Sequence, residues 1–333
     1  MRIGWAITTV GCFGSVREIV EMSNALVRRG HDVTIYHPTG EPVVWLPSLA
    51  HTATLERAKS DVLDILIIFP EWTDPLLLGV LGVCKATLKA CVLAGPDPNT
   101  ELVAQLSGDK KPSGPDIRRL RDAMFGKGYW FLPDSEWQAR WLRDEIGYAN
   151  VGPGWGGVNL AQFHHVIVRR ADKPLRILWS NDPRERKGSN IVRQAIDAVL
   201  ADTPDVVEES YWGKRVPQGE FAEWLCAGDI WVDGHRRAGW CNPVVEAMAC
   251  RLPVVCTDIP ASRILAEHEV TALIVPVDDT DAMIAAIRRM LADKELRGRL
   301  ARKAFDRVQA YSYDLLAVTL ESAIAAKLVE ALA

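Results

Sequence analysis

The sequence lacks a strong charge of either sign, paired cysteines and a long uncharged apolar run. Its net charge of -4 does not resemble the basic excess of nucleic-acid-binding proteins, so no nucleic-acid partner is expected. The seven cysteines occur singly, without a CxxC pair, which argues against a disulfide framework or a zinc site. Scattered free cysteines suit a reducing compartment, so we expect a cytoplasmic protein that binds no metal.

The longest apolar stretch, residues 76–95, carries Lys85 and Lys89 near its middle. Two central lysines are costly in a membrane span, so the stretch is predicted to divide into a helix and a strand. The amino-terminal residues MRIGWAITTVGCFG precede an amphipathic helix and a second β-like run. They are therefore predicted to begin with the first strand of a sheet rather than to form a signal sequence, and a soluble protein is expected.

Short β-branched runs alternate with amphipathic segments along the chain, as in a doubly wound α/β protein. With 333 residues, 48% of them hydrophobic, the chain suits two domains better than one. The glycine-rich residues 147–163 interrupt the alternation, which restarts at LRILWSND and predicts a boundary near 165–173. Predicted strands of the first half are RIGWAITTV, DVTIYHP, DILIIFP, KACVLAG, YWFLPDS and NVGPGW.

The most informative segment is WVDGHRRAGWCNPVVEAMACRLPVVCTD, residues 231–258. Two β-branched runs flank one short helix, which predicts a βαβ unit. Asn242 is predicted to cap this helix, with Pro243 as its first residue. Many capped helices of parallel-sheet proteins bind nothing, and that interpretation stays open on spacing alone.

The start of this helix is a candidate seat for a diphosphate. Free N–H groups and the helix dipole favour an anion there, and Arg236 and Arg237 lie just upstream. Glu246, one turn into the helix, would lie beside the anion and accept hydrogen bonds from two hydroxyls of a ribose. His235 would reach the donor sugar or simply end a strand. The candidate donor-binding residues of this segment are Gly239, Trp240, Cys241, Asn242, His235 and Glu246.

The segment AGWCNPVVEAMACRLPVVCTD resembles the donor-site signature of retaining GT-B glycosyltransferases, roughly EGFGLxxxEAMACGxPVVATD. These form the large glycogen-synthase-like and sucrose-synthase-like group 1, glycosyltransferase family 4. Glu246 matches the second glutamate of the signature, whereas the first, which the family places on the donor sugar, falls on Ala238. LPDSEWQARWL, with Ser135 as a helix cap, VGPGWGGVNLAQF and DIPASRILAEHEVTALIVP also resemble family segments, so the resemblance covers nearly the whole chain.

The resemblance implies the GT-B fold, with two doubly wound Rossmann-like domains facing a central cleft. It places an acceptor-side domain at residues 1–168 and a nucleotide-sugar-binding domain at 169–312. A final helix at 313–333 is expected to pack back on the first domain.

RERKG, residues 184–188, resembles the family's sequence pattern GRLxxxKG, whose arginine and lysine hold the donor diphosphate. Lys187 matches the lysine, while Asp182 takes the place of the arginine. Arg184 and Arg186 lie nearby and would compensate. These three cations are the candidate catalytic residues, although a lysine here can also be a solvated surface residue.

GCFGS, residues 11–15, resembles the family's glycine loop near the substrate phosphates. Gly11 and Gly14 permit positive φ and close backbone approach, and Ser15 can cap the following helix. Asp97, in the loop GPDPN, is a candidate acceptor-side contact or only a turn residue between two prolines.

The resemblance implies transfer of a sugar from a nucleoside diphosphate sugar to a sugar, lipid or small-molecule acceptor. Retention of anomeric configuration and independence of metal and cofactor are expected. A catalytically silent relative that binds nucleotide or serves as a partner subunit is the alternative, motivated by Ala238 and Asp182. An epimerase or phosphorylase of the same fold would need an acid–base pair or a pyridoxal phosphate lysine. The basic residues 109–127 suit either peripheral contact with the inner face of a membrane or a solvated protein surface. The sequence does not predict the oligomeric state.

Overall fold

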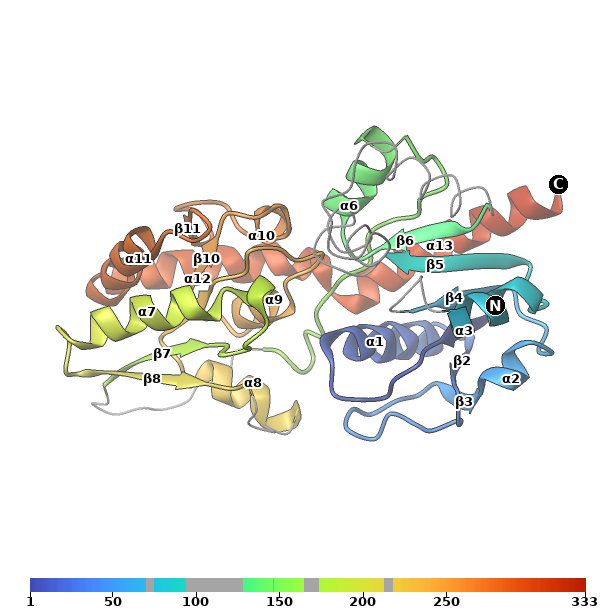
Figure 1. Ribbon diagram of the computed structural model, residues 1–333, viewed down its shortest axis with the longest axis horizontal. Helices are drawn as coiled ribbons and strands as arrows, with labels where there is room; N and C mark the ends of the chain where they lie inside the picture. The colour runs from blue at the N-terminus through green and yellow to red at the C-terminus, as the bar shows by residue number, and fades with distance from the viewer. Residues whose placement is uncertain (70–74, 94–127, 146, 165–173, 213–217) are drawn as a thin grey trace. The chain divides into compact units, whose positions relative to one another are not determined.

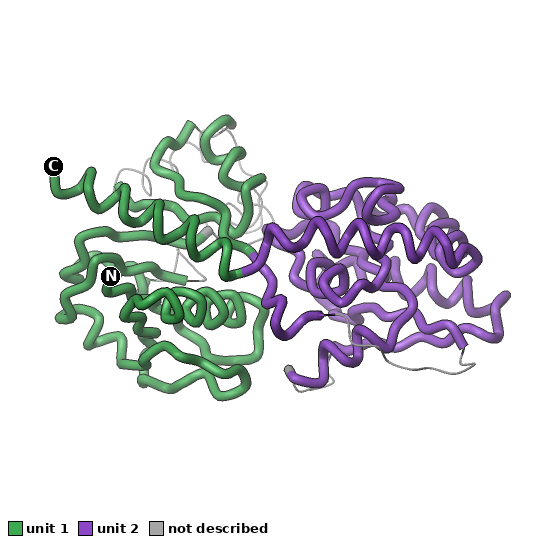
Figure 2. The backbone as a smooth tube through the Cα atoms, turned by 180° about the vertical axis from the view of Figure 1, so that it is seen from behind, with its two compact units in different colours: residues 1–156, 313–333 green, residues 157–312 purple. Residues whose placement is uncertain are grey.

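The computed structural model divides into two compact units (Figure 2). The first joins Met1–Gly156 to Tyr313–Ala333, and the second is Gly157–Ser312. The division between Gly156 and Gly157 falls within the glycine-rich stretch 147–163. The predicted boundary region, 165–173, lies outside the described residues. The described residues are 1–69, 75–93, 128–145, 147–164, 174–212 and 218–333.

A six-stranded parallel sheet forms the centre of the first unit (Figure 1). Its order is β3-β2-β1-β4-β5-β6, the arrangement of doubly wound dinucleotide-binding folds. β1 lies between β2 and β4, and Trp5 is in register with Ile35 and Ile67. The strands are β1 (Arg2–Ala6), β2 (Asp32–His37), β3 (His51–Thr54), β4 (Ile65–Ile68), β5 (Leu88–Leu93) and β6 (Trp130–Pro133).

Successive side chains of these strands point to opposite faces of the sheet and fill two cores. Ile3 and Trp5 lie in one core, which α1 and α13 cover, whereas Ala6 lies in the other, which α2 and α3 cover. Trp155 packs on Trp5 with the ring centroids 5.3 Å apart. The described helices are α1 (Gly14–Arg28), α2 (Leu55–Ala58), α3 (Pro75–Val83), α6 (Glu136–Arg140), the turn Trp141–Glu145 and α13 (Tyr313–Leu332).

The second unit contains a five-stranded parallel sheet of order β11-β10-β9-β7-β8. From β7 the chain passes outward to β8 and then returns to the other side of β7 to form β9. Such a reversal between neighbouring strands is a topological switch point, where open α/β sheets bind ligands beyond the carboxyl ends of the strands. The strands are β7 (Leu175–Trp179), β8 (Val206–Ser210), β9 (Ile230–Asp233), β10 (Val254–Thr257) and β11 (Leu273–Val275).

The helices of the second unit bury the apolar faces of this sheet. α7 and α11 contribute Val192, Ile196, Met283 and Ile287 to one buried core, and α9 packs against β9, β10, α8 and α12. The described helices are α7 (Ser189–Leu200), α8 (Gln218–Cys226), α9 (Asn242–Ala249), α10 (Pro260–Leu265), α11 (Thr280–Ala292) and α12 (Lys294–Val308), with short 3-10 turns at Glu185–Lys187 and Gln309–Tyr311.

Two local predictions for the first unit are wrong, and one strand was not predicted. β3 was not predicted, because HTAT is short, polar and largely exposed. NVGPGW is not a strand and makes only an isolated bridge between Val151 and Phe131. α1 begins at Gly14 with Phe13 in the N-cap position, so Ser15 lies inside the helix. Ser135 does occupy the N-cap position of α6, as predicted.

The apolar stretch that contains Lys85 and Lys89 divides into α3 and β5, as predicted. Within the described ranges, no helix is long and apolar enough to cross a bilayer. All seven cysteines are free, and five of them are buried.

Gly154 lies where the chain passes close to the start of α6. A Cβ atom at this position would come within 2.5 Å of the backbone N of Glu136 and the backbone C of Ser135. We expect Gly154→Ala to lower the free energy of unfolding by about 1–3 kcal/mol, because backbone must move to admit the methyl group. Gly79→Ala in α3 is the matched control, since a Cβ there meets nothing within 4 Å. Equal effects in chemical denaturation would contradict the prediction.

Candidate functional site

Two loops of the second unit meet where β7 and β9 end. One runs from Ser180 to Gly188, between β7 and α7, and the other from Gly234 to Cys241, between β9 and α9. β7 and β9 are neighbours in a parallel sheet, so the loops that leave their carboxyl ends lie side by side. The two loops therefore occupy the switch point of the sheet.

Gly188 and Gly234 bring these loops into close backbone approach. Gly188 has a φ of 59°, in the left-handed region that favours glycine. A Cβ atom at Gly188 would clash with the carbonyl oxygen of Gly234, and a Cβ at Gly234 would lie 2.8 Å from the carbonyl oxygen of Gly188. Neither position has room for a side chain, so both glycines are needed for the loops to meet.

Lys187 and His235, the neighbours of these glycines, contact each other. Nζ of Lys187 lies 2.6 Å from Nε2 of His235. Nδ1 of the same ring lies 2.7 Å from Oδ1 of Asp233, which also accepts the backbone N–H of His235 at 3.1 Å. The hydroxyl of Thr257 donates to the carbonyl of His235. An ammonium, an imidazole and a carboxylate thus form a chain that links the two loops.

Burial and neighbouring charges set the protonation of these three groups. Burial lowers the pKa of His235 below its usual value despite the opposing charge of Asp233. Burial alone would raise the pKa of Asp233, but His235 and Lys187 lower it overall. Burial, together with the charge of Arg186, lowers the pKa of Lys187 to about 8. At pH 7 the carboxylate is therefore ionised, the imidazole neutral and the ammonium charged.

Arg184 is held by Asp182, the residue at the position of the family's arginine. Nε of Arg184 lies 3.0 Å from Oδ1 of the buried carboxylate, and its guanidinium lies over the ring of Trp212, 5.1 Å from the centroid. Hydrogen bonds from Arg184 lower the pKa of Asp182, although burial opposes this. The carboxylate therefore fixes the guanidinium beside the loop.

The other arginines of the two loops are also engaged. Arg236 donates from Nε to Asp278 at 2.6 Å and from Nη1 to the carbonyl of Glu185 at 2.6 Å. Arg237 lies 3.4 Å from the Glu185 carboxylate. The carbonyl of Arg186 accepts the backbone N–H of Arg236 at 2.9 Å, which adds a second backbone link between the loops.

Helix α9 begins at Asn242, with Cys241 in the N-cap position and no capping bond from that side chain. The prediction that Asn242 is the cap is therefore wrong, and Pro243 is the second helical residue. A proline in the first turn still costs no helical hydrogen bond. Residues 239–241 lead into this helix start, where the positive end of the helix dipole lies.

Glu246 lies one turn into α9 and is buried. Trp240 is also buried and packs against Tyr311 with the ring centroids 5.4 Å apart, so it is not an exposed stacking surface. Ala238 is buried in the same loop and has no group that could bind a sugar hydroxyl.

The remaining predicted residues lie elsewhere. Gly11 follows β1 and Gly14 is the first residue of α1, both in the first unit, and neither is among the described glycines with positive φ. Asp97 and the basic residues 109–127 lie outside the described residues. Over the described ranges, no group of three or more His, Cys, Asp or Glu side chains is placed to hold a metal ion.

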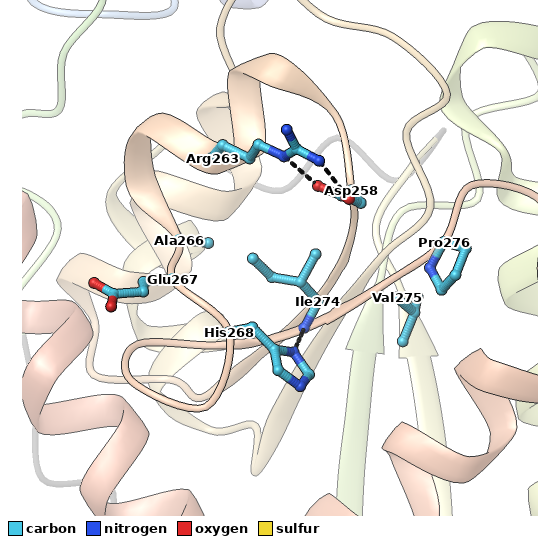
Figure 3. A pocket seen from close by; sticks show the side chains of 8 residues that line it. All are labelled: Asp258, Arg263, Ala266, Glu267, His268, Ile274, Val275 and Pro276. Atoms are coloured by element: carbon cyan, nitrogen blue, oxygen red, sulfur yellow. Dashed lines mark hydrogen bonds and ion pairs between the residues drawn. The ribbon is translucent and has the colours of Figure 1, made fainter.

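A pocket of about 450 Å³ lies beside α10 and β11 (Figure 3). Arg263 and Asp258 form a salt bridge there, with Nη2 2.7 Å from Oδ2. Nδ1 of His268 accepts the backbone N–H of Ile274 at 3.0 Å. The pocket shares no residue with the Lys187–His235 contact. Its lining residues are Asp258, Arg263, Ala266, Glu267, His268, Ile274, Val275 and Pro276.

Sequence reasoning missed Asp233 and Gly234. The available signal was a carboxylate two residues before a histidine at the end of a predicted strand, a spacing at which one side chain can accept from the other. Gly234 has no such signal, because its role depends on Gly188, a residue far away in the sequence.

Residues 186–293, which include Lys187, His235 and Glu246, match the family model of group 1 glycosyl transferases. The chain is 29% identical over 218 residues to the phosphatidyl-myo-inositol mannosyltransferase of Mycolicibacterium smegmatis. That match covers 55% of this chain and 53% of the relative, so it spans about half the length of the curated protein.

Two solved structures resemble nearly the whole chain. Sucrose-phosphate synthase from Thermosynechococcus elongatus has a TM-score of 0.71 at 16% identity, covering 99% of this chain and 100% of that one. Anabaena HepE in complex with UDP-glucose has a TM-score of 0.69 at 14% identity, with coverage of 99% and 100%. The fold is the GT-B fold of glycosyltransferases, as predicted, and the match to the group 1 glycosyl transferase model lies within the second unit.

Lys187 is expected to lower the stability of the free protein at neutral pH. Its pKa is about 8 when folded and 10.5 in the ordinary lysine, so between these values the unfolded chain binds more protons and stability rises with pH. As the pH rises from about 8 to 10.5, the free energy of unfolding of the wild type should increase by up to about 3 kcal/mol relative to that of Lys187→Met. Chemical denaturation at several pH values tests this, with Lys303→Met as an exposed control. A constant difference between wild type and Lys187→Met would contradict it.

Proposed function

We propose that the protein is a glycosyltransferase that moves a sugar from a nucleoside diphosphate sugar to an acceptor. We further propose that it retains the anomeric configuration and needs no bound metal. The observation that carries this proposal is the Lys187 ammonium, held beside His235 at the switch point of the group 1 domain. A compact cation beside a helix start suits a diphosphate at this edge of a parallel sheet.

The residues of the two loops suit stabilisation of a leaving diphosphate. When the bond from the anomeric carbon breaks, its electron pair goes to the diphosphate oxygen, and fixed positive groups lower the barrier. Lys187 supplies a charge, Arg184 and Arg186 flank it, and the N–H groups of residues 239–241 supply dipoles. The acceptor hydroxyl attacks the face from which the diphosphate departs and passes its proton to the departing oxygen, so no protein base is required.

Glu246 is the proposed ribose contact. Glu246 lies one turn inside α9. A carboxylate at that depth can accept from a ribose beside the helix start without competing with a phosphate for the N–H groups. Each hydroxyl donated to a carboxylate is a charge-assisted hydrogen bond worth about 1.5–3 kcal/mol.

Uridine diphosphate is the first nucleotide to test, since HepE was solved with UDP-glucose. The mycobacterial relative is named for a phosphatidyl-myo-inositol acceptor, so a lipid acceptor and peripheral membrane contact belong to the proposal alongside sugar and small-molecule acceptors.

A nucleotide-binding partner without transfer activity is the second candidate. Ala238 favours it, because the family's sugar-binding carboxylate is missing from a loop that otherwise resembles the signature. Release of free nucleoside diphosphate that depends on an acceptor would support the transferase, whereas tight nucleotide binding without turnover of any sugar nucleotide would support the partner.

Calorimetric titration with UDP, GDP, ADP and dTDP, followed by the matching sugar nucleotides, tests the donor site. Turnover in EDTA is expected to equal turnover with added Mg²⁺, and proton NMR of the first product is expected to show the donor's anomeric configuration. Loss of turnover in EDTA or an inverted product would overturn that part of the proposal.

Glu246→Ala is expected to weaken nucleotide affinity roughly 10- to 100-fold, because two ribose contacts are lost. Glu223→Ala on the exposed side of α8 is the control and should leave affinity unchanged. Calorimetry with the tightest-binding diphosphate is the measurement. An unchanged dissociation constant in Glu246→Ala would remove the ribose assignment.

A further inference from the structure

The ammonium of Lys187 contacts a neutral ring rather than a carboxylate. An ionised Asp233 can only accept, so the proton that joins it to His235 must reside on Nδ1. In the neutral ring Nε2 then carries a lone pair, and Lys187, which has donors only, must donate to it across 2.6 Å. One N–H of the ammonium is thereby committed and two remain for another ligand.

The imidazole itself is firmly anchored. Its side chain is 3% exposed and that of Asp233 is 2% exposed. Asp233 accepts both the ring and the backbone N–H of His235, and Thr257 donates to the carbonyl. The ring therefore presents Nε2 in one fixed direction, toward the loop that contains Lys187.

We propose that Asp233 and His235 form a positioning pair that aims the Lys187 ammonium at the diphosphate of the substrate. This inference rests on the proposed function and deepens it. A carboxylate in direct contact with Lys187 would neutralise the charge needed by the diphosphate. A neutral acceptor fixes the direction of the ammonium and leaves its charge available, while Asp233, one ring further away, fixes the tautomer.

The same geometry separates this pair from an acid–base catalyst. A general base must be within hydrogen-bond reach of the proton it removes from the substrate. Both ring nitrogens of His235 are occupied, Nδ1 by Asp233 and Nε2 by Lys187, and the ring is buried. His235 is thus a positioning residue that acts through Lys187.

A double-mutant cycle on UDP affinity tests the proposal. His235→Leu removes the acceptor and is expected to weaken UDP binding about 10-fold, whereas His235→Gln, which offers an amide oxygen, should stay within about 3-fold of wild type. His235→Leu should have no further effect once Lys187→Met is present. Additive losses from the two substitutions, or failure of glutamine to rescue, would overturn the proposal. His51→Leu in β3 is the exposed control, and thermal unfolding identifies variants that do not fold.

Asp233→Asn provides a second cycle. It should weaken UDP binding several-fold when His235 is present, because the tautomer is no longer fixed, and should have little effect in the His235→Gln background. An equal loss in both backgrounds would show that Asp233 acts on the fold rather than on the ring.

Nitrogen-15 NMR of the histidine rings tests the pair without any nucleotide. The wild type is expected to show His235 as a neutral ring protonated on Nδ1, and Asp233→Asn a mixture of tautomers. A ring protonated on Nε2, or doubly protonated at pH 7, would overturn the positioning pair whatever the protein binds. Absence of UDP, GDP, ADP and dTDP binding with the expected tautomer present would instead overturn the proposed function.

Discussion

The backbone contact between Gly188 and Gly234 is the constraint on which the site depends. The loops that leave β7 and β9 lie side by side because these strands are neighbours, but side chains on the two loops would ordinarily keep their backbones apart. Here the left-handed φ of Gly188 and the missing side chain at Gly234 let the loops touch. The contact brings the residue before Gly188, which is Lys187, within hydrogen-bond distance of the residue after Gly234, which is His235. Any side chain at either glycine would separate the ammonium from the ring that orients it.

Much of the fold was predictable from the alternation of apolar runs, because a parallel sheet buried on both faces requires them. The strands around LRILWS, WVDG and PVVCTD lie where that pattern predicts. The order of the strands was not predictable from the pattern, since spacing along the chain does not say on which side of β7 the next strand is added. β3 was not predicted because an edge strand with exposed side chains has no apolar pattern. NVGPGW was wrongly predicted as a strand because it pairs with β6 only at the isolated bridge between Val151 and Phe131.

The candidate site was predicted as separate motifs, and the structure shows how some of their residues meet. Lys187 and His235 were each singled out from their own loop, but their contact depends on strand order. The predicted start of α9 was one residue too late. A proline fits either of the first two helical positions, and the sequence does not distinguish between them. The hydrogen bonds between Arg184 and Asp182 were also not predicted from the sequence. The resemblance to the family motif showed Asp182 only as the loss of an arginine. In the structure it is the residue that holds one.

The charges around the two loops differ in how they are balanced. Arg184, Arg236 and Arg237 contact carboxylates, so much of their charge is already compensated before any ligand arrives. Lys187 contacts a neutral imidazole instead, and the nearest part of Asp233 is separated from it by that ring. An anion that enters the switch point would therefore be attracted most strongly by the Lys187 ammonium. In the free protein the burial of this charged group is unfavourable. A diphosphate beside the ammonium would offset this unfavourable burial, so the same charge can lower the stability of the free protein and favour an anionic ligand.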